Sequence, residues 1–230
     1  MEKKPVLLSW SSGKDSAWAL HYLRQDPTIE VVGLFTTLNQ TFERVAMHGV
    51  RKHVLLAQAE CVGLPITLID LPWPCSNDDY QRIMADFIAD QRGRGIRHIA
   101  FGDLFLADVR AYREQQPAGS GIMPLFPLWG YDTRSLAQEM MAAGLKARIS
   151  ALDPQRLDPA LGGHQFDPAL LAALADDVDP CGERGEFHTL AYDGPMFERP
   201  LKITVGETVW RDGVVFTDLL LVTASLTPAL

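Results

Sequence analysis

The most informative stretch of the sequence is Val6-Leu7-Leu8-Ser9-Trp10-Ser11-Ser12-Gly13-Lys14-Asp15-Ser16-Ala17-Trp18-Ala19-Leu20. A short apolar run gives way to small and polar residues with one lysine, and these lead into a helical pattern. The apolar run predicts a strand buried on both faces, and Ala17, Leu20 and Leu23 recur at the spacing of a packed helix face. The sequence therefore predicts a strand that turns directly into a helix.

The turn between this strand and this helix has the composition of a phosphate-binding loop. The first backbone N–H groups of a helix have no partner within it, and the helix dipole favours negative charge there. Ser11, Ser12 and Gly13 permit close approach of a phosphate to the backbone. Lys14 adds a counter-charge, and the Ser16 hydroxyl can donate a further hydrogen bond. We therefore expect a phosphate group to bind at this turn.

The same residues also fit a simpler role, an ordinary helix start capped by Ser12 or Asp15. The loop departs from the Walker A pattern, because Asp15 separates Lys14 from Ser16 and no earlier glycine stands at the required spacing before Gly13. This is not a phosphate loop of the Walker type.

Composition limits the class of protein. A chain of 230 residues with 47% hydrophobic and 22% charged residues matches one large globular domain, or one domain with an appendage. No apolar run has the length of a membrane span, and the start carries no signal-peptide cleavage site, so we expect a cytoplasmic protein without membrane association. Three scattered cysteines are too few for a disulfide framework and fit a reducing compartment.

Charge argues against a nucleic-acid partner. The formal net charge of −8 disfavours long-range attraction to a phosphate backbone unless a local basic patch exists. The densest basic cluster, Arg92, Arg94 and Arg97, is more typical of the solvated end of a helix than of an RNA site.

Strands and helices alternate through the first half of the chain. Apolar runs at 29–35, 65–71 and 97–102 predict further buried strands, and helical stripes lie between them. Asn77 can cap the third of these helices, and residues 39–47 have the polar, aperiodic composition of a loop. We therefore predict an α/β fold with a Rossmann-like parallel sheet and helices on both faces.

Ligands of open parallel sheets lie beyond the carboxyl ends of the strands. Phe35 and Thr36 are then placed to contact a nucleoside. His48 stands near the same edge, where it touches adenine or phosphate or is simply a cap or a packed surface histidine. Asp103 follows the fourth strand and either holds Mg²⁺ or a substrate amine, or caps a helix.

The composition changes between residues 116 and 130, where proline and glycine accumulate, and we place a domain boundary there. The predicted domains are a nucleotide-binding domain at 1–125 and a smaller C-terminal α+β domain at 126–230. We expect residues 146–152 to form a strand of the first sheet.

Two further segments of the C-terminal half have clear patterns. Residues 153–167 have the composition of a long loop, which is typical of lids, binding loops or mobile segments. Residues 201–209 and 214–222 alternate about an Asp212-Gly213 turn and predict a β-hairpin.

A second polar motif, Gly182-Glu183-Arg184-Gly185-Glu186-Phe187-His188-Thr189, precedes Asp193-Gly194-Pro195. Its two glutamates, followed by a histidine and a threonine at a strand start, can position an amine or polarise a carboxylate. A charged turn before a strand explains the same pattern equally well, because the two glycines fit a turn.

Residues 11–16 match the S-G-G-x-D-S signature of the PP-loop ATP pyrophosphatases at five of six places. Ser12 stands where that superfamily usually has a second glycine, and a Cβ restricts positive φ. Residues 11–16, Phe101-Gly102-Asp103 and the second motif together resemble the diphthine–ammonia ligase family, and this resemblance covers nearly the whole chain. Residues 185–189 read Gly-Glu-Phe-His-Thr, where the diphthamide enzymes more often carry Gly-Glu-Tyr-Glu-Thr. The sequence therefore resembles the bacterial branch of the family.

The resemblance implies an ATP-dependent amide ligase that uses Mg²⁺ and ammonia. Eukaryotic and archaeal members of the family adenylate the carboxylate of diphthine on elongation factor 2, and ammonia then displaces AMP. Bacteria do not make diphthamide, so we expect a different acceptor, a small-molecule carboxylate. We also leave open a homodimer.

The resemblance and the motifs together give a set of candidate site residues. The predicted catalytic residues are Lys14, Asp103, Glu183 and Glu186. The predicted nucleotide contacts are Ser9, Ser11, Ser12, Gly13, Lys14, Asp15, Ser16, Phe35, Thr36, His48 and Gly102. The predicted acceptor contacts are Asp103, Glu183, Glu186, His188 and Thr189, and no dedicated set of metal ligands is predicted.

Two other functions fit parts of the sequence. A nucleotide-binding sensor of the same α/β fold would bind ATP without turning it over. Sulfur transfer to tRNA is a second PP-loop chemistry, but it generally needs paired catalytic cysteines or an RNA-binding appendage, and neither is evident in the sequence.

Overall fold

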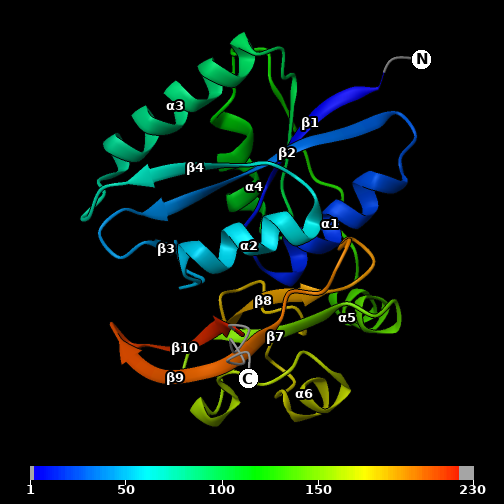
Figure 1. Ribbon diagram of the computed structural model, residues 1–230, viewed down its shortest axis with the longest axis vertical. Coiled ribbons are helices and arrows are strands. Elements are labelled where there is room, and N and C mark those ends of the chain that lie inside the picture. Colours follow the sequence, from blue (N-terminus) through cyan, green and yellow to red (C-terminus); the bar gives the residue numbers. More distant parts are fainter. Residues whose placement is uncertain (1–2, 223–230) are drawn as a thin grey trace, which may run out of the picture.

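The computed structural model describes residues 3–222, and within them the strands form two sheets (Figure 1). The first sheet and its helices come from the first half of the chain. Their elements are β1 (Lys4–Ser9), α1 (Lys14–Gln25), β2 (Ile29–Asn39), β3 (Arg44–Val45), α2 (Lys52–Val62), β4 (Ile66–Leu71), α3 (Asn77–Gly93), β5 (His98–Ala100), α4 (Ala107–Gln115) and β6 (Met123–Leu125).

The first sheet is parallel apart from one short strand. Its parallel strands lie in the order β4-β2-β1-β5-β6, and β3 pairs antiparallel with the end of β2. Each parallel connection passes through a helix, which is why strand and helix alternate in the sequence. The predicted Rossmann-like parallel sheet is confirmed.

The core has one layer on each face of the first sheet. Val6 and Leu8 of β1 point into the larger cluster, which includes α1 and α2 and continues into the second sheet. Leu7 points the other way, into a cluster with Phe87 and Ile88 of α3. Figure 1 shows α3 over one face and α1 and α2 over the other. Helices therefore cover both faces, as the sequence predicts.

The second sheet is antiparallel, in the order β8-β7-β10-β9, and lies against the α1 and α2 side of the first (Figure 1). Its helices are α5, α6 and the single-turn 3₁₀ helix η1. The elements are α5 (Thr133–Ala142), β7 (Lys146–Leu152), η1 (Pro159–Leu161), α6 (Pro168–Ala173), β8 (Phe187–Asp193), β9 (Ile203–Arg211) and β10 (Val214–Leu221).

Three local expectations are wrong. The strand at 146–152 is β7 of the second sheet, where it pairs with β8 and β10, because an apolar run is buried equally well in either sheet. Residues 39–47 are not all loop, since β2 runs to Asn39 and β3 pairs with its polar end. The cap of α3 is Ser76, whose hydroxyl accepts a hydrogen bond from the amide of Asp79.

The predicted hairpin is confirmed by β9 and β10, which meet at Asp212 and Gly213. Both turn residues have positive φ, the conformation that matches the twist of a two-residue hairpin. Residues 153–167 are mostly loop, with η1 within them. The last strand of the first sheet ends at Leu125, and the exact division at 125 and 126 stays a prediction.

No helix within residues 3–222 is both long and apolar enough to cross a membrane.

Candidate active site

The candidate site lies where the order of the first sheet reverses. In this sheet β2 and β4 lie on one side of β1, and the later strands β5 and β6 lie on the other side. Open α/β sheets bind ligands beyond the carboxyl ends of the strands at this point. The loop after β1, residues 10–13, and the loop that begins at Phe101 after β5 therefore flank one crevice.

The loop after β1 presents unpaired amides at the start of α1. Gly13 is the N-cap of α1, and its carbonyl accepts hydrogen bonds from the Ala17 amide at 3.1 Å and the Ser16 hydroxyl at 2.9 Å. The amides of Ser11 and Ser16 donate to no residue within 3–222, whereas the Asp15 amide contacts its own carboxylate. Free amides at a helix start are suited to an anion, so the geometry fits the predicted phosphate site.

Ser12 itself has an unfavourable backbone conformation. Its φ is +70°, and its hydroxyl is buried without a hydrogen-bond partner among the described residues. Its carbonyl accepts from the Gln58 side chain of α2 and from the Ala191 amide of β8, each at 2.9 Å. Contacts from two other elements therefore keep a serine in a region that glycine prefers.

We expect Ser12→Gly to stabilise the protein by about 1 kcal/mol, because relief of the left-handed strain and of the buried hydroxyl outweighs the entropy that glycine gains on unfolding. In a chain of this length the melting temperature should rise by roughly 2–4 °C. Thermal unfolding followed by circular dichroism measures this. Ser11→Gly, which changes a loop serine outside the left-handed region, is the control, and an equal rise in both variants would contradict the assignment of strain to Ser12.

A cavity of about 520 Å³ opens beside the loop. Of the predicted nucleotide contacts, Ser9, Ser11, Phe35, Thr36 and His48 line it. The Phe35 side chain is 3% exposed and packs on Phe87 and Phe101, so it forms part of the floor. The sequence did not single out the opposite wall, which comes from α3 and α4 and includes Tyr80, Met84, Asp108, Tyr112 and Arg113.

Lys14 points away from this cavity into the core. Its side chain is almost completely buried, and its ammonium group pairs with Asp15 at 2.9 Å and donates to the Cys181 carbonyl. The rings of Phe166 and Phe187 lie 5.4 and 5.2 Å from the ammonium. Burial lowers the pKa of Lys14, but Asp15, Cys181 and Glu183 together outweigh this effect and raise it, so the lysine stays charged.

Glu183 brings the second motif to the crevice. One of its carboxylate oxygens accepts the Leu104 amide at 2.8 Å, next to Asp103 at the end of the β5 strand region. Burial raises the pKa of Glu183 to about 7, and the Asp15 and Asp103 carboxylates add to the rise against the opposing Leu104 hydrogen bond. Such a carboxylate can take up or release a proton near neutral pH.

Asp15 and Asp103 fit a role beside a phosphate-bound Mg²⁺. Each has a buried carboxylate oxygen without a hydrogen-bond partner in the described part of the chain. Burial raises the pKa of both carboxyl groups, and repulsion from Asp15 raises that of Asp103 further. Residues 3–222 contain no cluster of three or more metal-binding side chains. This arrangement suits Mg²⁺, which commonly takes one or two carboxylates plus phosphate oxygens and water.

Gly102 lets the end of β5 approach the start of α1. A Cβ at this position would lie 3.0 Å from backbone atoms of Asp15 and Ser16. A glycine is therefore needed for the two loops of the crevice to pack together.

Glu186 braces the second motif rather than facing the cavity. It is buried, and its two carboxylate oxygens accept the Asp179 amide at 3.0 Å and the Arg184 amide at 2.9 Å. These bonds close the turn that carries Glu183. The geometry therefore gives Glu186 a positioning role, and its predicted contact with the acceptor stays a prediction.

Thr189 and two histidines join β8 to the loop after β1. The Thr189 hydroxyl accepts the Lys14 amide at 3.0 Å, and a His48 ring nitrogen lies 3.2 Å from the Thr189 carbonyl. The ring centres of His48 and His188 are 4.5 Å apart. Burial lowers the pKa of His188 to about 4 and that of His48 well below its usual range, so both rings are neutral at pH 7.

Comparison with family models identifies both halves of the chain. Residues 3–121 match the model described as the diphthamide synthase N-terminal domain, and residues 132–220 match the diphthamide synthase C-terminal domain. The chain belongs to the diphthamide synthase family. Its N-terminal family domain carries the loop, Gly102 and Asp103, and its C-terminal family domain carries Glu183, Glu186 and Thr189.

Individual relatives of this diphthamide synthase family member match over shorter stretches. The diphthine–ammonia ligase of Mus musculus is 32% identical over 100 residues, which cover 41% of this chain and 38% of that protein. That of Danio rerio is 34% identical over 110 residues, covering 45% and 43%, and that of Schizosaccharomyces pombe is 31% identical over 93 residues, covering 39% and 15%. The matched stretch spans less than half the length of each of these curated relatives.

Proposed function

We propose that this protein is an ATP-dependent amide ligase that adenylates an acceptor carboxylate and then aminates it with ammonia. The observation that carries the proposal is that Glu183, bonded to the Leu104 amide after β5, and the unpaired amides of the loop after β1 belong to adjacent strand ends of the first sheet. Family membership and relatives named diphthine–ammonia ligase support it. The acceptor we propose is a small molecule.

The first step forms a bond between an acceptor carboxylate oxygen and the α-phosphorus of ATP and breaks the bond to the β-phosphate, releasing pyrophosphate. The free amides of Ser11 and Ser16 are suited to bind the β and γ phosphates, where negative charge develops. The adenosine would occupy the cavity beside Phe35 and Thr36.

In the second step, neutral ammonia attacks the acyl carbon of the acyl adenylate, and AMP leaves with the electron pair of the broken bond. The amide product requires loss of a proton from the attacking nitrogen. Glu183 is suited to accept it, because its pKa of about 7 allows both protonation states near neutral pH.

Mg²⁺, when bound beside Asp15 and Asp103, would share the charge of the phosphates. The crevice also holds the carboxyl groups of Asp15, Asp103 and Glu183, and a cation beside them reduces the repulsion between their negative charges. Arg113 supplies one such charge, since its guanidinium lies 3.6 Å from Asp103.

The cysteines support amide formation over sulfur transfer. Cys61 and Cys181 are buried, and burial raises the pKa of both thiols, which opposes formation of a nucleophilic thiolate. Cys75 lines neither the crevice nor the cavity beside the loop.

The direct test is incubation with ATP, Mg²⁺, ammonium and a panel of small carboxylates. We expect release of AMP and pyrophosphate in equal amounts and only when an acceptor is present. Release of ADP as the nucleotide product would contradict the ligase, and ATP binding without release of either product under all conditions would favour the sensor.

A further inference from the structure

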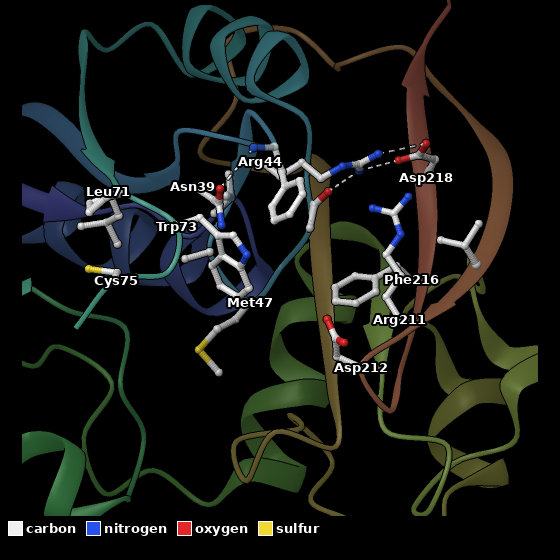
Figure 2. Close-up of a pocket in the computed structure, with 16 residues that line it drawn as sticks. Asn39, Arg44, Met47, Leu71, Trp73, Cys75, Arg211, Asp212, Phe216 and Asp218 are labelled. Atoms are coloured by element: carbon white, nitrogen blue, oxygen red, sulfur yellow. Dashed lines mark hydrogen bonds and ion pairs between the residues drawn. The ribbon is translucent and has the colours of Figure 1, made fainter. Parts of the chain in front are cut away.

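A second, larger pocket of about 760 Å³ lies between the first sheet and the β9–β10 hairpin (Figure 2). One wall comes from the end of β2, the β3 segment and the loop after β4, and includes Met47 and Trp73. The other wall comes from the hairpin and includes Arg211 and Phe216, which stand opposite Trp73 in Figure 2. Its volume is in the range of small-molecule sites.

Large apolar side chains gather at this pocket although water reaches them. Phe42, Met47 and Trp73 are 49%, 72% and 59% exposed, and the Phe42 and Trp73 rings meet edge to face at 5.6 Å. Exposed apolar residues are usually scattered singly over a surface, and a cluster around a concave site marks binding. The pocket therefore has an apolar, ring-lined interior.

One cation in this pocket is free. Arg44 binds Asp218 at 2.6 Å (Figure 2), and Arg51 binds the same carboxylate at 2.5 Å, so that carboxylate is fully engaged. Arg211 lines the same pocket, and its side chain makes no ion pair or hydrogen bond with any residue in 3–222. In a chain with a net charge of −8, an unpaired guanidinium beside aromatic rings favours an organic anion.

The pocket adjoins the proposed nucleotide cavity. Val45, Ala46, Met47 and Leu71 line both, so the two cavities share the β3 segment and the end of β4 as one wall. Two residues of that segment, Glu43 and Met47, have positive φ, which indicates a backbone held in an unfavourable shape at this wall. A molecule in the pocket would have one end next to the nucleotide.

We infer that this pocket binds the acceptor, an organic acid with an apolar, ring-bearing body and an acidic group at each end. The body would pack on Trp73, Phe42 and Phe216. One acidic group would pair with Arg211, and the other would lie at the shared wall, on the side of the nucleotide cavity. This inference rests on the proposed ligase function for the identity of the bound acid as acceptor.

The pocket can be tested without turnover by using 1-anilinonaphthalene-8-sulfonate, a fluorescent probe with aromatic rings and an acidic group. We expect Trp73→Ala and Arg211→Gln each to weaken binding of the probe by roughly tenfold, since each removes a contact worth about 1.4 kcal/mol or more. Trp210→Ala is the matched control, because Trp210 is 62% exposed but does not line the pocket. Unchanged probe affinity in both pocket variants would overturn the inference.

A second experiment separates this inference from the proposed function. If the wild-type protein forms AMP with a ring-bearing dicarboxylate such as phenylsuccinate, both pocket variants should raise the KM for that acid about tenfold and leave the KM for ATP unchanged. An unchanged acceptor KM would overturn the pocket while the ligase stands. If no acid yields AMP but both variants bind the fluorescent probe more weakly, the ligase function is wrong and the pocket is still an organic-acid site.

Discussion

Glu183→Gln is expected to lower the rate of acceptor amination by roughly 100- to 10,000-fold, the usual contribution of a positioned general base. Glutamine keeps the size of the side chain and a carbonyl oxygen that can still accept the Leu104 amide, so the loop should keep its shape. It cannot accept a proton. ATP affinity should stay within about twofold of the wild type, because the amides of the loop after β1 are unchanged.

The pH dependence gives a separate signature of Glu183. Its pKa is raised to about 7, first by burial and then by the nearby carboxylates. A base acts only when deprotonated, so the amination rate should be low at pH 6, rise through pH 7 and level off above pH 8, with the concentration of neutral ammonia held constant. Glu183→Gln should abolish this rise.

The control for Glu183 is Glu207→Gln on the exposed strand β9, which should behave like the wild type. The wild type, Glu183→Gln and Glu207→Gln are compared by their rates of AMP release at saturating ATP and acceptor. If Glu183→Gln retained the wild-type rate and the rise near pH 7, Glu183 would have no role in proton transfer.

The parallel arrangement of the first sheet and the edge at which the crevice lies could be predicted from the sequence because each depends on local signals. Apolar runs mark buried strands, and parallel strands put all their carboxyl ends on one edge. Residues 11–16 and Asp103 therefore had to lie close together once the alternation was recognised. Their actual closeness depends on Gly102, whose missing Cβ lets β5 approach Asp15.

Sequence reasoning was weaker wherever side-chain direction or long-range pairing decides. The apolar run of β7 gave no sign that its partners β8 and β10 lie much later in the chain. The amphipathic pattern of α4 did not mark Tyr112 and Arg113 as cavity wall, because the pattern does not say which helix face meets the crevice. Glu186 illustrates the same limit, since its carboxylate faces backbone amides rather than the cavity.

Lys14 is the position where the structure most changes the expected effect of a substitution. A lysine beside a phosphate loop suggests a phosphate ligand, but this ammonium is enclosed by Phe166, Phe187 and the Cys181 carbonyl. These contacts favour a structural role, in which Lys14 neutralises Asp15 where the two family domains meet. Lys14 also donates its amide to Thr189 of β8, so its backbone links β8 to the loop while its buried side chain packs in the interior.

We expect Lys14→Met to destabilise the protein by about 3 kcal/mol, because it leaves the Asp15 carboxylate without its cation and the Cys181 carbonyl without its donor. Methionine fills much of the same volume, so the loss reports on charge rather than on a cavity. The melting temperature should fall by roughly 6–12 °C, measured by thermal unfolding.

Adding Asp15→Asn to Lys14→Met should recover a large part of the stability lost by Lys14→Met, since an amide is less costly to leave without a cation than a carboxylate. A double-mutant cycle, with Asp15→Asn alone as the fourth corner, gives the coupling energy between the two side chains. A coupling near zero, or a Lys14→Met variant that keeps its melting temperature and loses only ATP affinity, would mean that the ammonium acts on the nucleotide instead. The cycle thus separates a lysine that binds phosphate from one that holds the loop in place by pairing with its neighbour.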